Sequence, residues 1–307
     1  MKAKKENKAD IIIDRVSARL LDDMKKYGSD WTKSWTGANS PINHVTTKNY
    51  TGINMPNLTY TMLDNDYKHN VWGTYKQWES KGYKVEKGQK SHTAVVYSET
   101  KVYPKRDGSL KENGEPETIR IYFNKCTPVF NIAQTDCPTK EYEANKPKQV
   151  FDLEAVEQFV KNTKAVIKAG GDKAFYSPKL DYVGMPDKDS FIKTESASAT
   201  ENYYGTLLHE LTHWTSHKDR CNRKLGMTFG NDQYAYEELI AESGSAMLCG
   251  LLGVSNEPRA DHAKYLNCWI KHLEEKPSKM KSALGQASKA VQFLTNLQEM
   301  ARVKKVA

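Results

Sequence analysis

Residues 207–220, LLHELTHWTSHKDR, contain two histidines four positions apart, with a glutamate directly after the first. Residues four apart on a helix lie one above the other, so His209 and His213 can direct two imidazole nitrogens at one metal ion. Glu210 lies about a third of a turn away, where its carboxylate can reach a water molecule without binding the metal. Zinc lowers the pKa of such a water to about 7, and an adjacent carboxylate can accept its proton. The spacing therefore predicts metal ligands at His209 and His213 and a catalytic base at Glu210.

The residues before this motif specify the helix that the spacing requires. Ser198 and Glu201 form an S-x-x-E capping box, a pattern typical of a helix N-terminus. The apolar run YYGTLLHEL follows directly. We therefore expect a helix that begins just after Ser198 and carries the motif.

A catalytic zinc site needs a third protein ligand and one open position. The segment DQYAYEELIAESGSAML, residues 232–248, has the pattern of a second helix, on which Glu238 and Glu242 share a face. Its YEELIAE stretch is similar to the N-E-x-x-x-D pattern of thermolysin-type zincins, with Glu242 in place of Asp. In that pattern the first glutamate binds zinc, and the carboxylate four residues later holds the other nitrogen of a ligand histidine. We therefore predict Glu238 as the third ligand and Glu242 as the carboxylate that orients a histidine.

Two other residues compete for these roles. Glu237 is an alternative ligand, although it points about 100° away from Glu238. His217 comes only four residues after His213, a full turn further along the helix, so a surface role or a contact with a ligand is expected rather than a place in the ligand set. A solvated acidic face is the alternative for the glutamates, but the apolar residues around Ala241 indicate that part of this helix is buried.

The charge of the chain is concentrated in its first half. Residues 1–150 contain 25 Lys and Arg against 18 Asp and Glu, a balance of +7, whereas the rest of the chain adds only +1. Four of the six tryptophans also lie in the first half. A basic half that is rich in aromatic residues favours nucleic-acid binding, with a solvated basic surface above an aromatic core as the alternative.

Composition also limits the class of protein. The chain has no run of 18 apolar residues and no apolar segment typical of a secretory signal near its N-terminus, so we expect a cytoplasmic protein without a membrane partner. The five cysteines include no C-x-x-C pair. Free thiols in a reducing compartment are therefore expected, and a cysteine-based zinc site is not.

The pattern of elements predicts an α+β fold with two domains. A polar stretch at 135–150 is the expected linker between a mixed α/β domain at 1–140 and a mainly helical domain at 150–307. In the first domain we expect a helix over 11–28, a helix-like segment at 72–82 and strands at 93–103 and 118–132. In the second we expect a helix over 151–169 ended by Gly170 and Gly171, two short strands within 174–192, and a helical tail over 260–302.

Segments in both halves resemble one family. LLHELTHWTSHKDRCNR and YAYEELIAESGSAMLCGLLG are similar to the zincin-like metallopeptidase domain of ArdC-type antirestriction proteins, which conjugative plasmids and phages carry. WTKSW, PINHVTTKNYTGIN, GTYKQWESKGYKVEKGQKSHTAVVY and PVFNIAQTD resemble the N-terminal single-stranded-DNA-binding domain of the same family. The chain departs from the usual family pattern at Asp30 and Ser34, where proline is common, and at Ser216, where glycine is common. The resemblance implies a zincin-like fold, single-stranded DNA as the partner, and protection of incoming DNA from host restriction.

Non-specific binders of single strands combine cations for phosphates with aromatic faces for bases. By that chemistry the candidate DNA contacts are Trp31, Lys33, Trp35, Lys48, Tyr50, Lys76, Lys84, Lys87 and Lys90. For the tryptophans the alternative is packing in the core, which we expect for Trp72 and Trp78 in particular. For the lysines the alternative is a solubilising surface.

These observations predict an antirestriction protein that binds single-stranded DNA and carries a zinc metallopeptidase site, with manganese or cobalt as alternative metals. One alternative is a dedicated zinc protease whose basic half recruits a protein substrate, such as a component of the host restriction system. Another is an inactive zincin whose metal only stabilises the fold. Three tyrosines are candidates for stabilising charge on a substrate carbonyl: Tyr176, Tyr204 and Tyr234.

Overall fold

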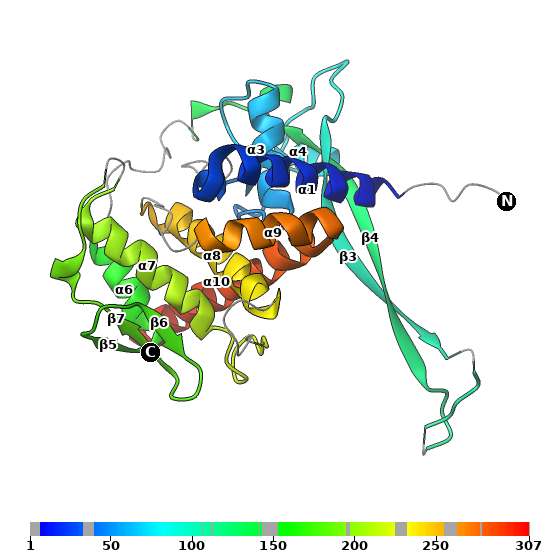
Figure 1. Cartoon of the computed structure of the whole chain (residues 1–307). Helices are drawn as coiled ribbons and strands as arrows, with labels where there is room; N and C mark the ends of the chain where they lie inside the picture. The colour runs from blue at the N-terminus through cyan, green and yellow to red at the C-terminus, as the bar shows by residue number, and fades with distance from the viewer. Residues whose placement is uncertain are drawn as a thin grey trace.

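The computed structural model describes residues 7–32, 40–105, 107–111, 113–140, 142, 153–194, 197–224, 232–254, 263–276 and 278–306. Within them, a helical body carries two small sheets, and a long two-stranded arm projects away from it (Figure 1). This arrangement confirms the expected α+β class, with mixed structure in the first half and mainly helices in the second. No helix in these ranges is long and apolar enough to cross a membrane.

The first half contains a sheet with the strand order β1-β2-β4-β3. The two shortest strands, β1 and β2, pair in parallel, whereas β4 is antiparallel to both β2 and β3. The elements are α1 (Lys8–Tyr27), a 3₁₀ turn (Gly28–Thr32), β1 (Ile42–Asn43), α3 (Asn54–Asp64), β2 (Val71–Gly73), α4 (Tyr75–Ser80), β3 (Thr93–Pro104), β4 (Thr118–Asn131) and a second 3₁₀ turn (Ile132–Gln134). The expected opening helix and the two long strands are confirmed.

α3 is not anticipated from the sequence. Every residue from Met55 to Met62 is buried, so the helix has no polar face whose period would reveal it. Its side-chain amides bind the backbone of β3: Asn54 Nδ2 donates to the Val96 carbonyl at 2.8 Å, and Asn57 Nδ2 donates to the Ala94 carbonyl at 3.0 Å. α3 therefore occupies the free edge of β3 where that strand joins the body.

The second half places a three-stranded sheet beside a group of helices. Its order is β5-β7-β6, with β5 parallel and β6 antiparallel to β7. The elements are α6 (Leu153–Thr163), β5 (Val166–Ala169), β6 (Phe175–Ser177), β7 (Tyr182–Met185), a 3₁₀ turn (Lys188–Ser190), α7 (Ala199–Trp214), α8 (Asp232–Leu252), α9 (Ala263–Glu275) and α10 (Ser278–Val306). The two short strands and the helical tail agree with expectation.

The helix expected over 151–169 is too long. α6 ends at Thr163, because Lys164 adopts a left-handed backbone conformation with φ of 58°. The Thr163 hydroxyl donates to the Val160 carbonyl and accepts from the Ala165 N–H, which closes the helix end. The residues after it then form β5, where their apolar pattern pairs with β7 instead of continuing the helical period.

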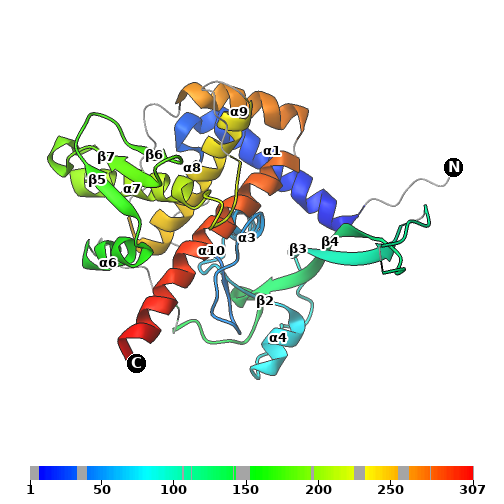
Figure 2. The ribbon, with the colours of Figure 1, turned by 90° about the horizontal axis from the view of Figure 1, so that it is seen from below.

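The two halves share one hydrophobic core. α1 packs against α9 and α10, and α10 also packs along α8, as Figure 2 shows from below. Ile13 and Leu20 from α1 join Leu239 of α8, Trp269 of α9 and Leu284 of α10 in this core. The opening helix is therefore part of the helical body. The linker expected at 135–150 falls largely outside the described residues, so the domain boundaries stay a prediction.

Candidate metal centre

α7 begins where the capping box places it. Ser198 is the N-cap, its side chain accepts from the Glu201 N–H at 3.2 Å, and the Glu201 carboxylate accepts from the Ser198 N–H at 2.9 Å. Satisfying these N–H groups fixes the start of the helix and hence the rotation of the motif about its axis. The histidines of α7 face α8, and both are buried.

The helices α7 and α8 approach closely beside the motif. A Cβ atom on Gly244 of α8 would lie only 2.6 Å from Cγ2 of Thr212 on α7, so only glycine fits there without a shift. The Thr212 hydroxyl is also held, because it donates to the Leu208 carbonyl at 2.9 Å. This close approach brings the glutamates of α8 to the histidines of α7.

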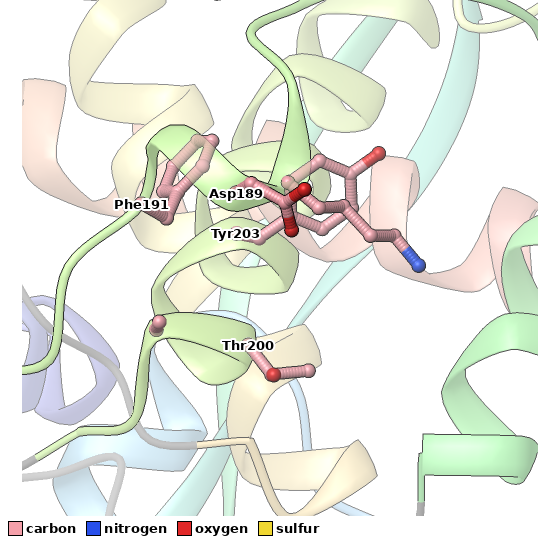
Figure 3. A pocket seen from close by; sticks show the side chains of 6 residues that line it. Asp189, Phe191, Thr200 and Tyr203 are labelled. Atoms are coloured by element: carbon pink, nitrogen blue, oxygen red, sulfur yellow. The ribbon is translucent and has the colours of Figure 1, made fainter.

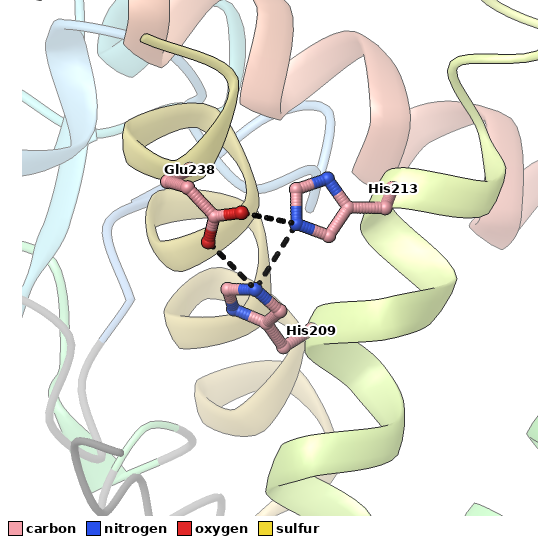
Figure 4. A group of neighbouring side chains, drawn as sticks. All are labelled: His209, His213 and Glu238. Carbon is pink, nitrogen blue, oxygen red and sulfur yellow. Dashed lines mark hydrogen bonds and ion pairs between the residues drawn. The ribbon is translucent and has the colours of Figure 1, made fainter. Parts of the chain in front are cut away.

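Three side chains converge between these helices, as Figure 4 shows. Nε2 of His209 lies 3.1 Å from Nε2 of His213. The two carboxylate oxygens of Glu238 lie 3.5 Å from these nitrogens, one from each. Two imidazole nitrogens and one carboxylate from separate helices therefore meet at one point.

The spacing of these atoms can be tested against metal geometry. A tetrahedral ion with ligand bonds of about 2.0–2.1 Å holds its ligand atoms about 3.3–3.4 Å apart. The two nitrogens at 3.1 Å, and their contacts of 3.5 Å to different oxygens of Glu238, are close to that value, and with one ligand atom per residue all three atoms lie within 4.8 Å of one another. Imidazole nitrogen with a carboxylate oxygen is also a donor set suited to zinc, and it accommodates other divalent transition metals. The three residues therefore fit a divalent ion.

Each ligand histidine has a second carboxylate on its other ring nitrogen. Oε2 of Glu242 lies 3.6 Å from Nδ1 of His209. Oε1 of Glu237 lies 3.4 Å from Nδ1 of His213. Such carboxylates orient the imidazole and select the tautomer whose outer nitrogen can bind a metal. Glu242 lies on that side of the His209 ring, and its orienting role stays a prediction. Glu237, the alternative ligand, instead contacts the far side of His213.

Arg223 holds Glu237 in this position. Nη2 of Arg223 donates to Oε1 of Glu237 at 2.7 Å, and Nε donates to Oε2 at 3.1 Å. The guanidinium also donates to the Thr215 hydroxyl and the Thr212 carbonyl, both at 2.8 Å and both at the end of α7. Both charged side chains are 5% exposed. Two hydrogen bonds from one guanidinium fix the orientation of the Glu237 carboxylate and favour its charged form. Arg223 was not singled out from the sequence, because it lies in an irregular segment with no motif of its own.

The charges at the centre reinforce one another. Burial alone would lower the pKa of both histidines, but the surrounding carboxylates outweigh it, so the pKa of His209 is raised and that of His213 is raised to about 10. Burial would raise the pKa of Glu238, but His209 and His213 hold it well below its usual range. Burial likewise opposes the low pKa of Glu237, which His213 and Arg223 maintain. The centre is therefore built to keep positive charge between its carboxylates.

Glu210 is buried on α7, 4% exposed, and its negative charge acts on both histidines. His217 stands apart from the three-residue group, within the part of the chain that the structure describes. Its Nδ1 lies 3.5 Å from the carboxylate of Asp219 and accepts from the Asp219 N–H at 3.3 Å. These positions agree with the expected separation of His217 from the ligands.

The three candidate tyrosines have separate surroundings. The Tyr176 hydroxyl donates to Asp181 at 2.9 Å, and burial together with this carboxylate raises the pKa of Tyr176 to about 12. The Tyr204 hydroxyl donates to Glu157 at 2.7 Å. Tyr234 packs against the core that α1 shares with α8. The contacts of Tyr176 and Tyr204 are made with side chains outside the three-residue group.

Tyr203 lines a separate hollow of about 400 Å³, shown in Figure 3. Tyr203 lies in the first half of α7, six residues before His209. Its lining residues are Lys188, Asp189, Phe191, Ala199, Thr200 and Tyr203. None of them belongs to the three-residue group.

The candidate DNA contacts are distributed over the first half. Trp31 is completely buried in the shared core, which argues against its predicted contact with bases. Lys33 and Trp35 lie outside the described residues. Tyr50 is half-buried, and its hydroxyl accepts from Asn43 Nδ2 at 2.7 Å. Lys48, Lys76, Lys84, Lys87 and Lys90 are all exposed, and none forms an ion pair with another described residue. Trp72 and Trp78 are both buried, as expected for core residues.

Comparison with known proteins identifies both halves. Residues 10–130 match the N-terminal domain of the anti-restriction factor ArdC, and residues 154–286 match a zincin-like metallopeptidase domain. The protein y4eC of Sinorhizobium fredii is 32% identical over 289 residues, covering 92% of this chain and 90% of that protein. A DNA primase TraC of Escherichia coli is 33% identical over 299 residues, but the match covers only 27% of its length.

Solved structures also indicate similarity to ArdC. The chain is similar to the metal-free antirestriction protein ArdC from plasmid R388, with a TM-score of 0.68 and 30% identity over 93% of this chain and 97% of that one. It is also similar to the Mn(II)-bound form, with a TM-score of 0.66 and 28% identity. The metal in that relative and the geometry above both indicate a divalent-metal site.

Proposed function

This chain belongs to the ArdC antirestriction family, and on that basis we propose that it protects DNA entering a cell from host restriction. In this proposal the first half binds single-stranded DNA, and the zincin-like second half carries a zinc-dependent peptidase site. Manganese is the alternative metal, since the relative from plasmid R388 was solved with Mn(II).

One observation carries the peptidase proposal: Nε2 of His209 and Nε2 of His213 lie 3.1 Å apart, each lies 3.5 Å from one carboxylate oxygen of Glu238, and the buried Glu210 directly follows His209 in the chain. A bound divalent ion would supply Lewis acidity, polarising a peptide carbonyl and lowering the pKa of a water molecule. Glu210 would accept the proton of the attacking water and deliver it to the departing amine. Glu237 and Glu242 would keep the imidazoles in the orientation that ligation needs.

The DNA-binding proposal is supported by charge and by relationship. Lys84, Lys87 and Lys90 lie close together in the chain beside Lys76, all exposed and without described ion-pair partners, so their charges remain available to phosphates. The relatives include a DNA primase, TraC, whose matching portion spans nearly the whole of this chain. Both features favour a nucleic acid as the partner of the first half.

Binding and restriction assays test the proposal together. The purified chain is expected to shift a labelled single-stranded oligonucleotide at lower protein concentration than a duplex of the same sequence. Cells that express the chain are expected to accept unmodified DNA more efficiently in the presence of a restriction system. Equal or absent binding to both forms of DNA contradicts the DNA half of the proposal.

The role of the metal centre needs its own variant. Glu210→Gln removes the proposed base without removing a ligand, and Glu201→Gln on the same helix is unsuitable as its control because Glu201 caps α7. Glu299→Gln, on the exposed part of α10, is the matched control. If Glu210→Gln abolishes both peptide cleavage and the protection of unmodified DNA, the peptidase is responsible for protection. Protection that survives in Glu210→Gln assigns it to DNA binding alone.

A further inference from the structure

The arm formed by β3 and β4 exposes many large apolar side chains. Figure 1 shows it extending away from the helical body, and residues elsewhere in the described chain leave its outer part uncovered. Soluble proteins seldom expose apolar side chains in such a group unless a partner contacts them. The exposed apolar residues are Tyr97, Val102, Tyr103, Leu110, Ile119, Ile121, Tyr122 and Phe123.

The strand register divides these side chains between two faces. Directly opposed residues of an antiparallel pair lie on the same face, and alternate residues along each strand share it. Tyr103 opposes Ile119, and Glu99 opposes Phe123. One face, called here the aromatic face, therefore carries Tyr97, Glu99, Lys101, Tyr103, Ile119, Ile121, Phe123 and Lys125.

A contact across the strands supports this assignment. The ammonium of Lys101 lies 5.9 Å from the ring centroid of Phe123, a cation–π contact that requires both side chains on one face. Lys125 forms an ion pair with Glu99, its diagonal neighbour on the same face. Aromatic rings and cations are thus interleaved along a single surface.

The base of the arm is anchored through its opposite face. Asn124 opposes Ser98, and its Nδ2 donates to the carboxylate of Asp10 on α1 at 2.7 Å. Lys281 of α10 donates to Oδ1 of Asn124. The body therefore contacts the face that carries Asn124, and the aromatic face is directed away from these helices into solvent.

The charge of the arm favours an anionic partner. On the aromatic face Lys101 and Lys125 stand against Glu99, a net charge of +1, whereas Arg120 lies on the opposite face. The connecting residues 105–117 carry three basic and four acidic side chains. Aromatic rings interleaved with Lys101 and Lys125 on one face suit the bases and phosphates of a nucleic acid.

We propose that the aromatic face of the β3–β4 arm is a stacking platform for unpaired bases of a single-stranded nucleic acid. Tyr97, Tyr103 and Phe123 contact base faces, and Lys101 contacts the backbone between them. This inference rests on the proposed function, because it assumes that the first half binds single strands. The proposal assigns two kinds of DNA contact to different places: bases stack on the arm, and the lysines around α4 neutralise phosphates.

The test compares two faces of the same arm. Tyr103→Ser with Phe123→Ser alters the aromatic face. Val102→Ser with Tyr122→Ser is the matched control, since it removes two side chains that are more exposed but lie on the opposite face. Binding of a labelled 30-nucleotide oligo(dT) by the full chain is measured by fluorescence anisotropy at several salt concentrations, and circular dichroism checks the fold of each variant.

The aromatic-face variant is expected to bind oligo(dT) about tenfold or more weakly, and the control within about twofold of the wild type. The salt dependence of the remaining binding should be unchanged, because stacking releases no counterions. A shortened arm, in which Asn-Gly joins Thr100 to its partner Tyr122, should show the same tenfold loss or more.

Four other results would contradict the inference, each for a different reason. A wild-type chain that does not bind oligo(dT) overturns both the proposed function and the platform. Normal binding by the aromatic-face variant overturns the platform alone. Equal losses in both variants overturn the assignment to this face. Unchanged oligo(dT) binding with a loss of self-association, measured by sedimentation, assigns the face to a second copy of the chain instead.

Discussion

The carboxylate of Glu237 lies 3.4 Å from Nδ1 of His213, whereas Nε2 of the same ring lies 3.5 Å from Glu238. The imidazole of His213 thus lies between two carboxylates, that of Glu237 and that of the proposed ligand Glu238. Arg223 in turn fixes Glu237 with two hydrogen bonds of 2.7 and 3.1 Å. These contacts, from Arg223 to Glu237 and from Glu237 to His213, connect the segment after α7 to the metal centre.

Replacing Glu237 tests the orienting role. Glu237→Gln should weaken binding of a divalent ion about 10- to 100-fold, because loss of such a carboxylate frees the tautomer and the ring orientation of the ligand. Zinc affinity can be measured by competition with a chromogenic chelator. The exposed residue Glu274 provides the control, and its change to Gln should leave affinity as it is. An unchanged affinity in Glu237→Gln would remove Glu237 from the centre.

Replacing Glu210 tests the catalytic base. Glu210→Gln should lower peptide cleavage roughly 100- to 10,000-fold, the usual contribution of a general base. The three ligands remain, so metal content measured by atomic emission should stay equal to that of the wild type. Full activity in the variant contradicts the proposed role, and loss of metal would show that Glu210 acts on the fold of the site instead.

Metal removal should destabilise the fold. A ligand present at 100 times its Kd stabilises the native state by about 2.7 kcal/mol, so adding zinc to the metal-free chain should raise the melting temperature by several degrees. His209→Ala should abolish this increase, because it removes one of the three ligand atoms. An equal increase in both proteins would place the metal elsewhere. Differential scanning fluorimetry is sufficient for the comparison.

The contact between α7 and α8 predicts a packing effect at Gly244. Gly244→Ala would place a methyl group 2.6 Å from Cγ2 of Thr212, so the helices must separate or Thr212 must move. We expect a loss of about 1–3 kcal/mol in the free energy of unfolding, measured with urea. Gly285→Ala on α10, which meets no atom within 4 Å, should be neutral or slightly stabilising.

The lysines beside α4 should determine the salt dependence of DNA binding. Changing Lys84, Lys87 and Lys90 to Ala should reduce the slope of log K against log salt by about 0.7 for each phosphate that the chain no longer neutralises, or roughly 2 in total. Lys173, Lys179 and Lys193 are also exposed but lie in the second half, and their replacement is the control. Equal slopes for both variants would place the phosphate-binding cations elsewhere.

Local signals in the sequence were sufficient to predict elements that form within a single helix or hairpin. The capping box at Ser198 and Glu201 placed the start of α7, and alternating apolar residues revealed β3 and β4. The end of α6 was not predicted, because it depends on the left-handed backbone of Lys164 and on the pairing of the following residues with β7. α3 was not predicted, because it is buried on all sides and therefore lacks the polar face that reveals an amphipathic helix.

The metal centre was accessible from spacing only in part. Four-residue spacing placed His209 with His213 and Glu238 with Glu242, but it could not say which carboxylate faces which nitrogen. Spacing alone therefore leaves Glu237 open as a ligand, whereas in the structure its carboxylate contacts Nδ1 of His213. The alternation of Trp31, Lys33 and Trp35 suggested a binding surface, whereas the packing of α1 buries Trp31 in the core.

Calorimetric titration of zinc into the metal-free chain tests the central claim most directly, namely that His209, His213 and Glu238 hold one ion together. The wild type should bind a single ion per chain, and Glu238→Ala should bind it about 100-fold more weakly or not at all. Wild-type protein that binds no ion, or a Glu238→Ala variant with unaltered affinity, would contradict the claim.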